Sequence, residues 1–123
     1  MLEDLQAARR VLIVDDHPSF RRSARALLES EGFEVVGEAE DGAAAIAAVS
    51  VLAPDLVLLD VQLPDVDGFE VASRLLDRDR DLAIVLVSSR DRCEYGSLVD
   101  ASGARGFVSK AELSGAALAS LLE

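Results

Sequence analysis

The chain has 123 residues, of which half are apolar, and it carries a net charge of −11 and a single cysteine. This length and composition are typical of one domain with one hydrophobic core, and they exclude a disordered or fibrous protein; with no apolar run near about 20 residues and no signal-peptide pattern, we expect no membrane contact. The negative charge disfavours direct nucleic-acid binding by this chain, and the lone Cys93 excludes an internal disulfide, which suits a cytoplasmic protein.

Apolar runs and helical patterns alternate along the whole chain. Residues 1–9 are a polar lead-in, and we take 10–123 as the domain. Strands are predicted over residues 11–14, 34–39, 56–60, 83–87 and 106–108. Helices are predicted from Pro18 to the turn at Gly32, and then near 43–52, 68–78, 92–101 and 112–122. In the fourth helix we expect Leu98 and Val99 to face the core and Cys93 to be a partly buried filler.

This order of strand and helix, repeated five times, predicts an α/β fold. Helical stretches of about ten residues between strands imply right-handed crossovers, and therefore a parallel sheet with helices on both faces. The three most apolar strands should be central, whereas the polar strand 34–39 and the short strand 106–108 should be edges. The predicted strand order is therefore 2-1-3-4-5.

Polar side chains follow four of the five predicted strands. They are Asp15 and Asp16, Asp60, Ser88 and Lys110. One alternative is that Asp15 and Asp16 cap the next helix, although capping needs only one of them, and another is that all five form a solvated rim. Because parallel strands end at the same edge of a sheet, where ligands bind, we favour a functional site.

Three clustered carboxylates would repel one another unless a cation joined them. Oxygen ligands in an open cleft favour Mg²⁺, and one histidine with one cysteine makes no zinc site. A carboxylate beside Mg²⁺ and an ammonium suits aspartyl-phosphate chemistry, with Asp60 as the nucleophile. Lys110 is the only lysine among eleven arginines; it is either a chance survivor or a position that needs a compact ammonium.

Several motifs together resemble a known family. They are Asp15-Asp16, Leu58-Leu59-Asp60 with Pro64 and Asp67-Gly68, Val87-Ser88, and Phe107-Val108-Ser109-Lys110. At these spacings the chain resembles the response-regulator receiver domain of two-component signalling over residues 10–122. The stretch from Asp15 to Arg21 and the segment Lys110-Ala111-Glu112-Leu113 resemble receivers that precede LuxR-type DNA-binding domains. The resemblance implies a doubly wound, flavodoxin-like (βα)5 fold.

The resemblance also implies roles for the acidic residues. Asp60 would accept a phosphoryl group from a sensor histidine kinase or a phosphotransfer protein. Asp16 and Asp60 would bind Mg²⁺ directly, together with the backbone carbonyl of Gln62, and Asp15 would act mainly through water. The domain would not be a conventional enzyme, although it could catalyse its own phosphorylation from small donors and its own dephosphorylation.

The resemblance implies that the remaining motif residues would bind the phosphoryl group or change conformation in response to it. Ser88 would hydrogen-bond it, Lys110 would pair with it, and Phe107 would change rotamer when Ser88 moves. The face made by the fourth helix, fifth strand and fifth helix would then change and could form a homodimer, and any DNA contact would belong to a segment outside this chain. Departures from the family pattern are mild: Leu63 replaces a frequent Met, Ser89 replaces Ala or Gly, and Phe107 replaces Tyr.

Two other classes of function are alternatives to a signalling switch that phosphorylation of Asp60 would activate. An Asp-nucleophile hydrolase usually carries a second acid two residues after the nucleophile, where this chain has Gln62, and it needs a cap for which the chain has no room. A degenerate receiver that acts only by binding would not need all five site residues. His17 is expected to face solvent and not to be a ligand, whereas Tyr95 is either a contact residue or surface.

Overall fold

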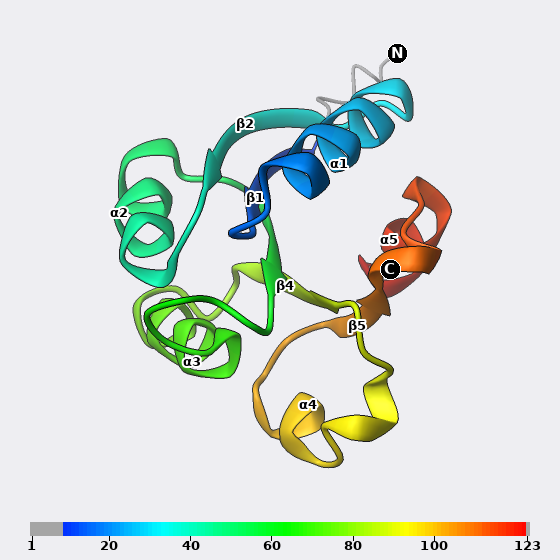
Figure 1. Ribbon diagram of the computed structural model, residues 1–123. Coiled ribbons are helices and arrows are strands. Elements are labelled where there is room, and N and C mark those ends of the chain that lie inside the picture. The colour runs from blue at the N-terminus through cyan, green and yellow to red at the C-terminus, as the bar shows by residue number, and fades with distance from the viewer. Residues whose placement is uncertain (1–8, 123) are drawn as a thin grey trace.

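A parallel β-sheet runs through the centre of the molecule (Figure 1). The computed structural model describes residues 9–122. The sheet has five strands in the order β2-β1-β3-β4-β5, as predicted. They are β1 (Arg10–Val14), β2 (Glu34–Ala39), β3 (Leu56–Asp60), β4 (Ala83–Ser88) and β5 (Gly106–Ser109). The polar β2 and the short β5 are the two edges, and the apolar β1, β3 and β4 are central.

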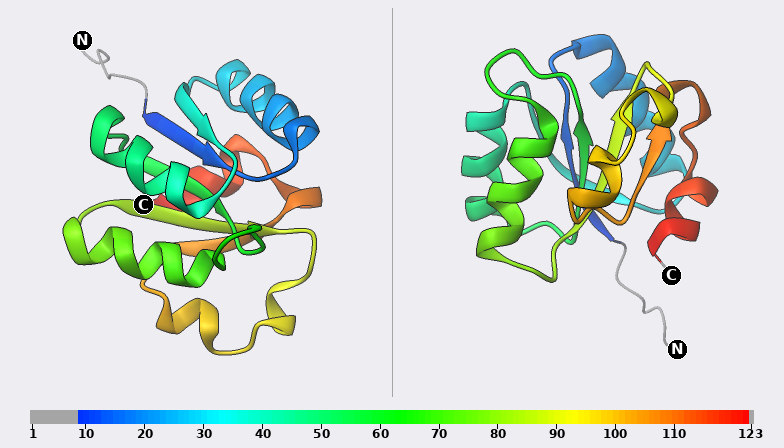
Figure 2. Two further views of the ribbon diagram at one scale, coloured as in Figure 1. Left: turned by 60° about the vertical axis from the view of Figure 1, so that its left-hand side comes forward. Right: turned by 90° about the horizontal axis from the view of Figure 1, so that it is seen from below.

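Helices cover both faces of the sheet (Figure 2). One face carries α1 (Pro18–Ser30) and α5 (Gly115–Leu122), and the other carries α2 (Gly42–Leu52), α3 (Gly68–Arg78) and α4 (Leu98–Ala101). Two short 3₁₀ turns, η1 (Arg92–Glu94) and η2 (Lys110–Glu112), precede α4 and α5. The doubly wound α/β architecture predicted from the sequence is therefore confirmed.

The central strands divide the core into two layers. Alternate residues of a strand point to opposite faces, so Leu12 and Val14 of β1 pack with α2 and α3, whereas Val11 and Ile13 pack with α1 and α5. Every residue of β3 is buried, including the final Asp60. The strand that carries the predicted nucleophile is therefore held on both faces by apolar packing.

The segment 92–101 differs from its prediction of one continuous helix. The chain forms η1, then passes through Gly96 with a φ of +58°, and only then forms the single turn of α4. This left-handed residue interrupts the helical hydrogen-bond ladder. As a result Val99 is buried as expected, but Leu98 is 54% exposed and Cys93 is also exposed, so both of these predictions are wrong.

The last helix also begins later than predicted. The hydroxyl of Ser114 accepts a hydrogen bond from the backbone N–H of Ala117, which is the geometry of a helix N-cap. The helix α5 therefore starts at Gly115, and residues 110–112 form the separate turn η2. Leu118 and Leu122 anchor α5 against the sheet.

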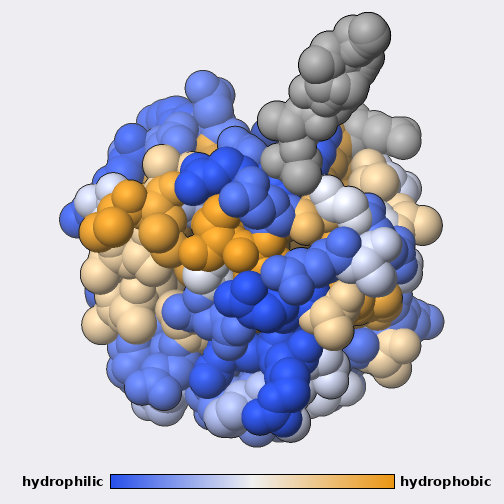
Figure 3. All heavy atoms as spheres, turned by 90° about the horizontal axis from the view of Figure 1, so that it is seen from above, coloured by the Kyte–Doolittle hydropathy of each residue, from blue (hydrophilic) through white to orange (hydrophobic). Residues whose placement is uncertain are grey.

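Apolar side chains also reach the surface near α2. Figure 3 shows hydrophobic residues gathered at the side of the molecule where α2 lies, and Val51 of this helix is 80% exposed. Exposed apolar side chains of this kind are common on globular proteins and need no functional explanation. None of the helices in the described part of the chain has the length and apolar character that crossing a membrane requires.

A close backbone approach at Gly68 fixes the loop after β3. The N–H of Gly68 donates to the carbonyl oxygen of Val61 at 2.7 Å. A Cβ atom at residue 68 would lie 2.3 Å from the backbone carbonyl oxygen of Asp60. Only glycine fits there without moving backbone, and α3 begins at this residue with Asp67 as its N-cap.

Gly68→Ala should therefore lower the free energy of unfolding by about 1–3 kcal/mol, the usual cost of overpacking against atoms that cannot yield. Urea unfolding measures this change. Gly37→Ala is the matched control, because its Cβ would meet the movable Leu52 Cδ1 first, at 2.7 Å. An equal or smaller loss for Gly68→Ala would contradict the constraint.

Candidate functional site

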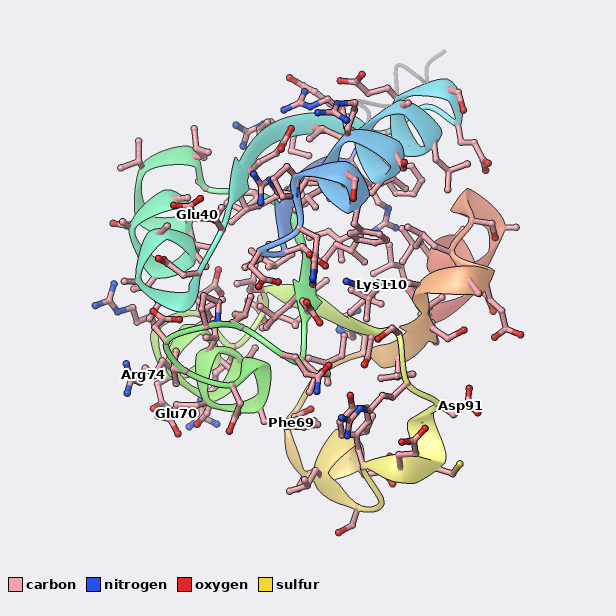
Figure 4. All side chains as sticks on the ribbon, in the orientation of Figure 1. Glu40, Phe69, Glu70, Arg74, Asp91 and Lys110 are labelled. Carbon is pink, nitrogen blue, oxygen red and sulfur yellow. The ribbon has the colours of Figure 1, made fainter. Side chains whose placement is uncertain are left out.

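Two buried carboxylates and one ammonium meet at the carboxyl ends of the strands. Asp15 follows β1, Asp60 ends the neighbouring β3, and both are buried. Lys110, at the end of β5, extends its side chain toward them across the end of β4 (Figure 4). Its Nζ lies 2.5 Å from Asp15 Oδ2 and 3.5 Å from Asp60 Oδ2. The long aliphatic stem of lysine allows a residue on an edge strand to reach this centre.

Further contacts fix Asp15 and Lys110. The backbone N–H of His17 donates to Asp15 Oδ1 at 2.8 Å, and the guanidinium of Arg21 donates to the Asp15 carbonyl oxygen at 2.5 Å. Lys110 Nζ lies 4.5 Å from the centre of the Phe20 ring, a cation–π geometry. The N-cap position of α1 is His17, with no side-chain capping bond, so the alternative that Asp15 or Asp16 caps this helix is wrong.

Asp16 and His17 form the outer side of the acidic cluster. The Asp16 side chain is 35% exposed, but its Oδ1 is buried and accepts no hydrogen bond among the described residues. The His17 ring is mostly exposed, as predicted, yet its Nδ1 lies 3.0 Å from Asp16 Oδ1 and 3.1 Å from Asp15 Oδ1. Ligand atoms of Asp15, Asp16, His17 and Asp60 all lie within 4.8 Å of one another. This position of the His17 ring was not predicted; the place of His17 directly after the acid pair is the only sequence signal for it, and that spacing does not fix the orientation of the ring.

Burial raises the pKa of Asp60 from 3.8 to about 6. Burial is the largest cause of this net shift in pKa; the Gln62 N–H, 3.1 Å from Asp60 Oδ1, and the charge of Lys110 act against it, and the charge of Asp15 acts with it. One ammonium therefore does not balance the two buried carboxylates and the adjacent Asp16. An additional cation fits this excess of negative charge, and the clustered carboxylate oxygens are the ligands that Mg²⁺ prefers.

A second polar group lies beside this cluster at the end of β4. The buried hydroxyl of Ser88 accepts a hydrogen bond from the Arg90 N–H at 3.0 Å, and its Oγ lies 2.6 Å from the hydroxyl of Tyr95. Phe107 of β5 is half-buried, with its ring centre 5.8 Å from that of Tyr95. The sequence left the role of Tyr95 open; its contact with Ser88 makes it part of the site.

The comparisons with known proteins agree with this geometry. The family model described as the response regulator receiver domain matches residues 11–122. The chain belongs to the response-regulator receiver family. The sequence resemblance, the flavodoxin-like fold class and the placement in two-component signalling are thereby confirmed.

Several relatives refine this placement. The transcription regulator BvgA of Bordetella pertussis is 39% identical over 103 residues, which cover 84% of this chain and 49% of BvgA. A LuxR-family response regulator from Aurantimonas sp. SI85-9A1 is 31% identical, with a TM-score of 0.84 and coverage of 94% of this chain and 86% of that one. The response regulator TrrA of Thermotoga maritima, solved in complex with Mg(2+)-BeF, is 32% identical, with a TM-score of 0.75 over 82% of this chain and 85% of that one.

The chain spans about half the length of the curated relatives it matches. The similarity to receivers of LuxR-type regulators is confirmed. These relatives are regulators, which disfavours the hydrolase alternative. The roles of the individual site residues remain predictions.

The raised pKa of Asp60 predicts how stability depends on pH in the absence of metal. A raised pKa means that the native state binds the proton more tightly than the unfolded state, so this stabilisation is complete below about pH 3.8 and is lost as the pH rises through about 6. Asp60→Asn cannot ionise and should therefore exceed the wild type in free energy of unfolding at pH 8 by up to about 3 kcal/mol.

Urea unfolding with a chelator between pH 3.5 and 8 checks this difference, which should disappear near pH 3.5. Asp65→Asn is the control of opposite sign, because hydrogen bonds led by the Gly42 N–H lower the pKa of Asp65, so its charged form stabilises the native state above about pH 3.8. A difference for Asp60→Asn that stays constant with pH would mean that this carboxyl is not destabilised by burial.

Proposed function

We propose that this domain is a phosphorylation-controlled switch, in which Asp60 accepts a phosphoryl group in a Mg²⁺-dependent reaction. The observation that carries the proposal is the setting of Asp60. It ends a fully buried strand, one of its oxygens accepts the Gln62 N–H, and the other faces the ammonium of Lys110. The donor would be a phosphohistidine of a sensor histidine kinase or a phosphotransfer protein. Its P–N bond breaks as a bond forms between phosphorus and an Asp60 oxygen.

The predicted metal ligands suit this reaction. Asp15 already contacts Lys110 through Oδ2 and the His17 N–H through Oδ1, which favours its acting on the ion through water. Asp16 Oδ1 contacts only the mostly exposed ring of His17, at 3.0 Å, whereas Asp15 Oδ2 contacts the ammonium of Lys110; this difference favours Asp16 as a direct ligand with Asp60 and the Gln62 carbonyl. Bound there, Mg²⁺ would neutralise the phosphoryl oxygens. The related TrrA was solved in complex with Mg(2+)-BeF, which supports a Mg²⁺-dependent reaction in this domain.

Lys110 and Ser88 would then bind the phosphoryl group. Lys110 Nζ is 3.5 Å from an Asp60 oxygen, so it can pair with a phosphoryl group there after a small movement. Ser88 would turn its hydroxyl toward the same group, and Phe107 would occupy the volume that Ser88 leaves. The two arrangements give two shapes to the face of α4, β5 and α5, and phosphorylation biases the equilibrium between them.

The changed face would control an output. We expect it to promote self-association of the phosphorylated domain, whereas DNA contact would belong to a part of the protein outside this chain. The alternative is a degenerate receiver that binds partners without phosphorylation. The convergence of Asp15, Asp60, Ser88 and Lys110 at one edge supports the switch over this alternative.

Incubation with acetyl phosphate and Mg²⁺ should add one phosphoryl group to the wild-type domain. Intact-protein mass spectrometry should detect it, and Asp60→Ala should abolish it because the acceptor oxygen is gone. Asp65→Asn, which removes a carboxylate outside the cluster, should be labelled normally. An unlabelled wild type would favour the binding-module alternative, and a labelled Asp60→Ala would place the acceptor elsewhere.

Lys110→Arg should slow phosphorylation by about tenfold or more although the charge is kept. A planar guanidinium cannot occupy the position of a compact ammonium between Asp15 and Asp60, and one lost charge-assisted hydrogen bond is enough for a tenfold effect. The rate of labelling by acetyl phosphate measures this effect. Arg105→Lys, a swap at an exposed cation, is the control. Wild-type rates in Lys110→Arg would show that the lone lysine is a chance survivor.

A further inference from the structure

The segment between β4 and β5 is attached to the body of the domain by very few side chains. Across residues 89–102 only Val99 is buried, Tyr95 and Ser102 are half-buried, and the others are exposed. Val99 is part of the apolar core layer that lies between the sheet and the helices α2, α3 and α4. Tyr95 is partly buried and packs against the same layer. The Ser102 hydroxyl bonds within its own segment and to the next residues, at Val99 and Ala104. Tyr95 and Val99 are therefore the two anchors of this segment.

Tyr95 contacts both residues that the proposed switch would move. Its hydroxyl lies 2.6 Å from Ser88 Oγ, and its ring centre lies 5.8 Å from that of Phe107. The Tyr95 ring also contacts that of Phe69 at the start of α3, edge to face, with the ring centres 5.6 Å apart. In Figure 4, Phe69 lies between α3 and the segment that carries α4. The side chain of Tyr95 thus contacts one residue each of α3, β4 and β5.

The hydroxyl of Ser88 has few hydrogen-bonding choices. It carries one proton and two lone pairs, and in this structure it accepts from the Arg90 N–H and shares a hydrogen bond with Tyr95. A phosphoryl oxygen accepts hydrogen bonds only, so Ser88 must give it the proton. Its second lone pair could still accept from Tyr95, but Oγ moves when the side chain turns to another rotamer, and a contact as short as 2.6 Å would lengthen or break as Oγ turns toward that group.

We propose that Tyr95 is a positioning residue that holds Ser88 in its resting orientation and is released when Ser88 turns to a phosphoryl group on Asp60. The inference rests on the proposed function and deepens it. The Ser88–Tyr95 hydrogen bond opposes activation, and its loss weakens one of the two anchors of residues 89–102, which then holds only through the contacts of the Tyr95 ring. The movement of Ser88 would therefore affect η1 and α4 through its contact with the Tyr95 hydroxyl. This route would act beside the one proposed above, in which Phe107 fills the volume that Ser88 leaves.

The first test is the affinity for beryllofluoride, used with Mg²⁺ as a phosphoryl analogue. Tyr95→Phe keeps the ring contacts and removes only the hydroxyl, so calorimetry should give a dissociation constant about two- to tenfold lower than in the wild type, the range of one net hydrogen bond. Ser102→Ala is the matched control, because it deletes a half-buried hydroxyl of the same segment that does not contact Ser88. Its affinity should equal that of the wild type.

The second test uses the spectrum of Tyr95 itself. The chain has one tyrosine and no tryptophan, so its near-ultraviolet absorption and its fluorescence report this phenol alone. Beryllofluoride with Mg²⁺ should shift that spectrum in the wild type. Ser88→Ala should show the shifted spectrum before any addition, because the partner of the phenol is missing. A residue that only fills space would not produce this agreement.

The outcomes separate the inference from the proposed function. A wild type that does not bind beryllofluoride overturns both. Binding with an unchanged tyrosine spectrum, or with unchanged or weaker affinity in Tyr95→Phe, overturns the role of Tyr95 while the switch stands. An equal gain in affinity in Ser102→Ala also overturns it, because general loosening of the segment would then explain the effect. Tighter binding in Tyr95→Phe alone, with the spectral shift, supports the inference.

Discussion

Two buried carboxylates, Asp15 and Asp60, share one ammonium, that of Lys110. This arrangement exists only because three parallel strands end at one edge of the sheet and because the lysine stem is long enough to cross the end of β4. Burial of the negative charge destabilises the ionised form of Asp60, which raises its pKa to about 6. The apolar packing of β3 holds the carboxyl in place despite this cost. A bound cation would offset this excess of negative charge, which supports the proposed metal site at this edge.

The same edge connects this charge to the surface. Lys110 and Ser88 are the groups that a new phosphoryl oxygen would attract, and each already has another partner, Asp15 for the lysine and Tyr95 for the serine. A change of charge at Asp60 would therefore act on groups that already hold other contacts. The segment around α4 is the part best able to respond, since two side chains anchor it and Gly96 interrupts its helix. The well-packed site at the strand ends and the weakly anchored residues 89–102 would therefore act together in the proposed switch.

The sequence predicted the features that depend on local pattern. Apolar runs ended by polar residues located four strands, and the polarity of residues 34–39 identified an edge, so the strand order followed. The prediction of one continuous helix over residues 92–101 was wrong, because helical periodicity does not reveal the left-handed backbone of Gly96. Leu98, which follows this interruption, is exposed and does not face the core. The contact of Tyr95 with Ser88 and the position of the His17 ring between two acids could not be read from spacing either. Both depend on how side chains of separate or strongly turned segments meet in space.

In the proposed switch, a phosphoryl group on Asp60 would change the orientation of Ser88, and this change would alter the packing near Phe107. The most direct measurement compares backbone amide NMR spectra of the domain with and without beryllofluoride and Mg²⁺. The account predicts shifts at the acidic cluster that continue through Ser88 and Tyr95 to Phe107 and the flanking α4 and α5. Shifts confined to Asp15, Asp16 and Asp60 would contradict it, because the site would then bind the analogue without moving the face that carries the output.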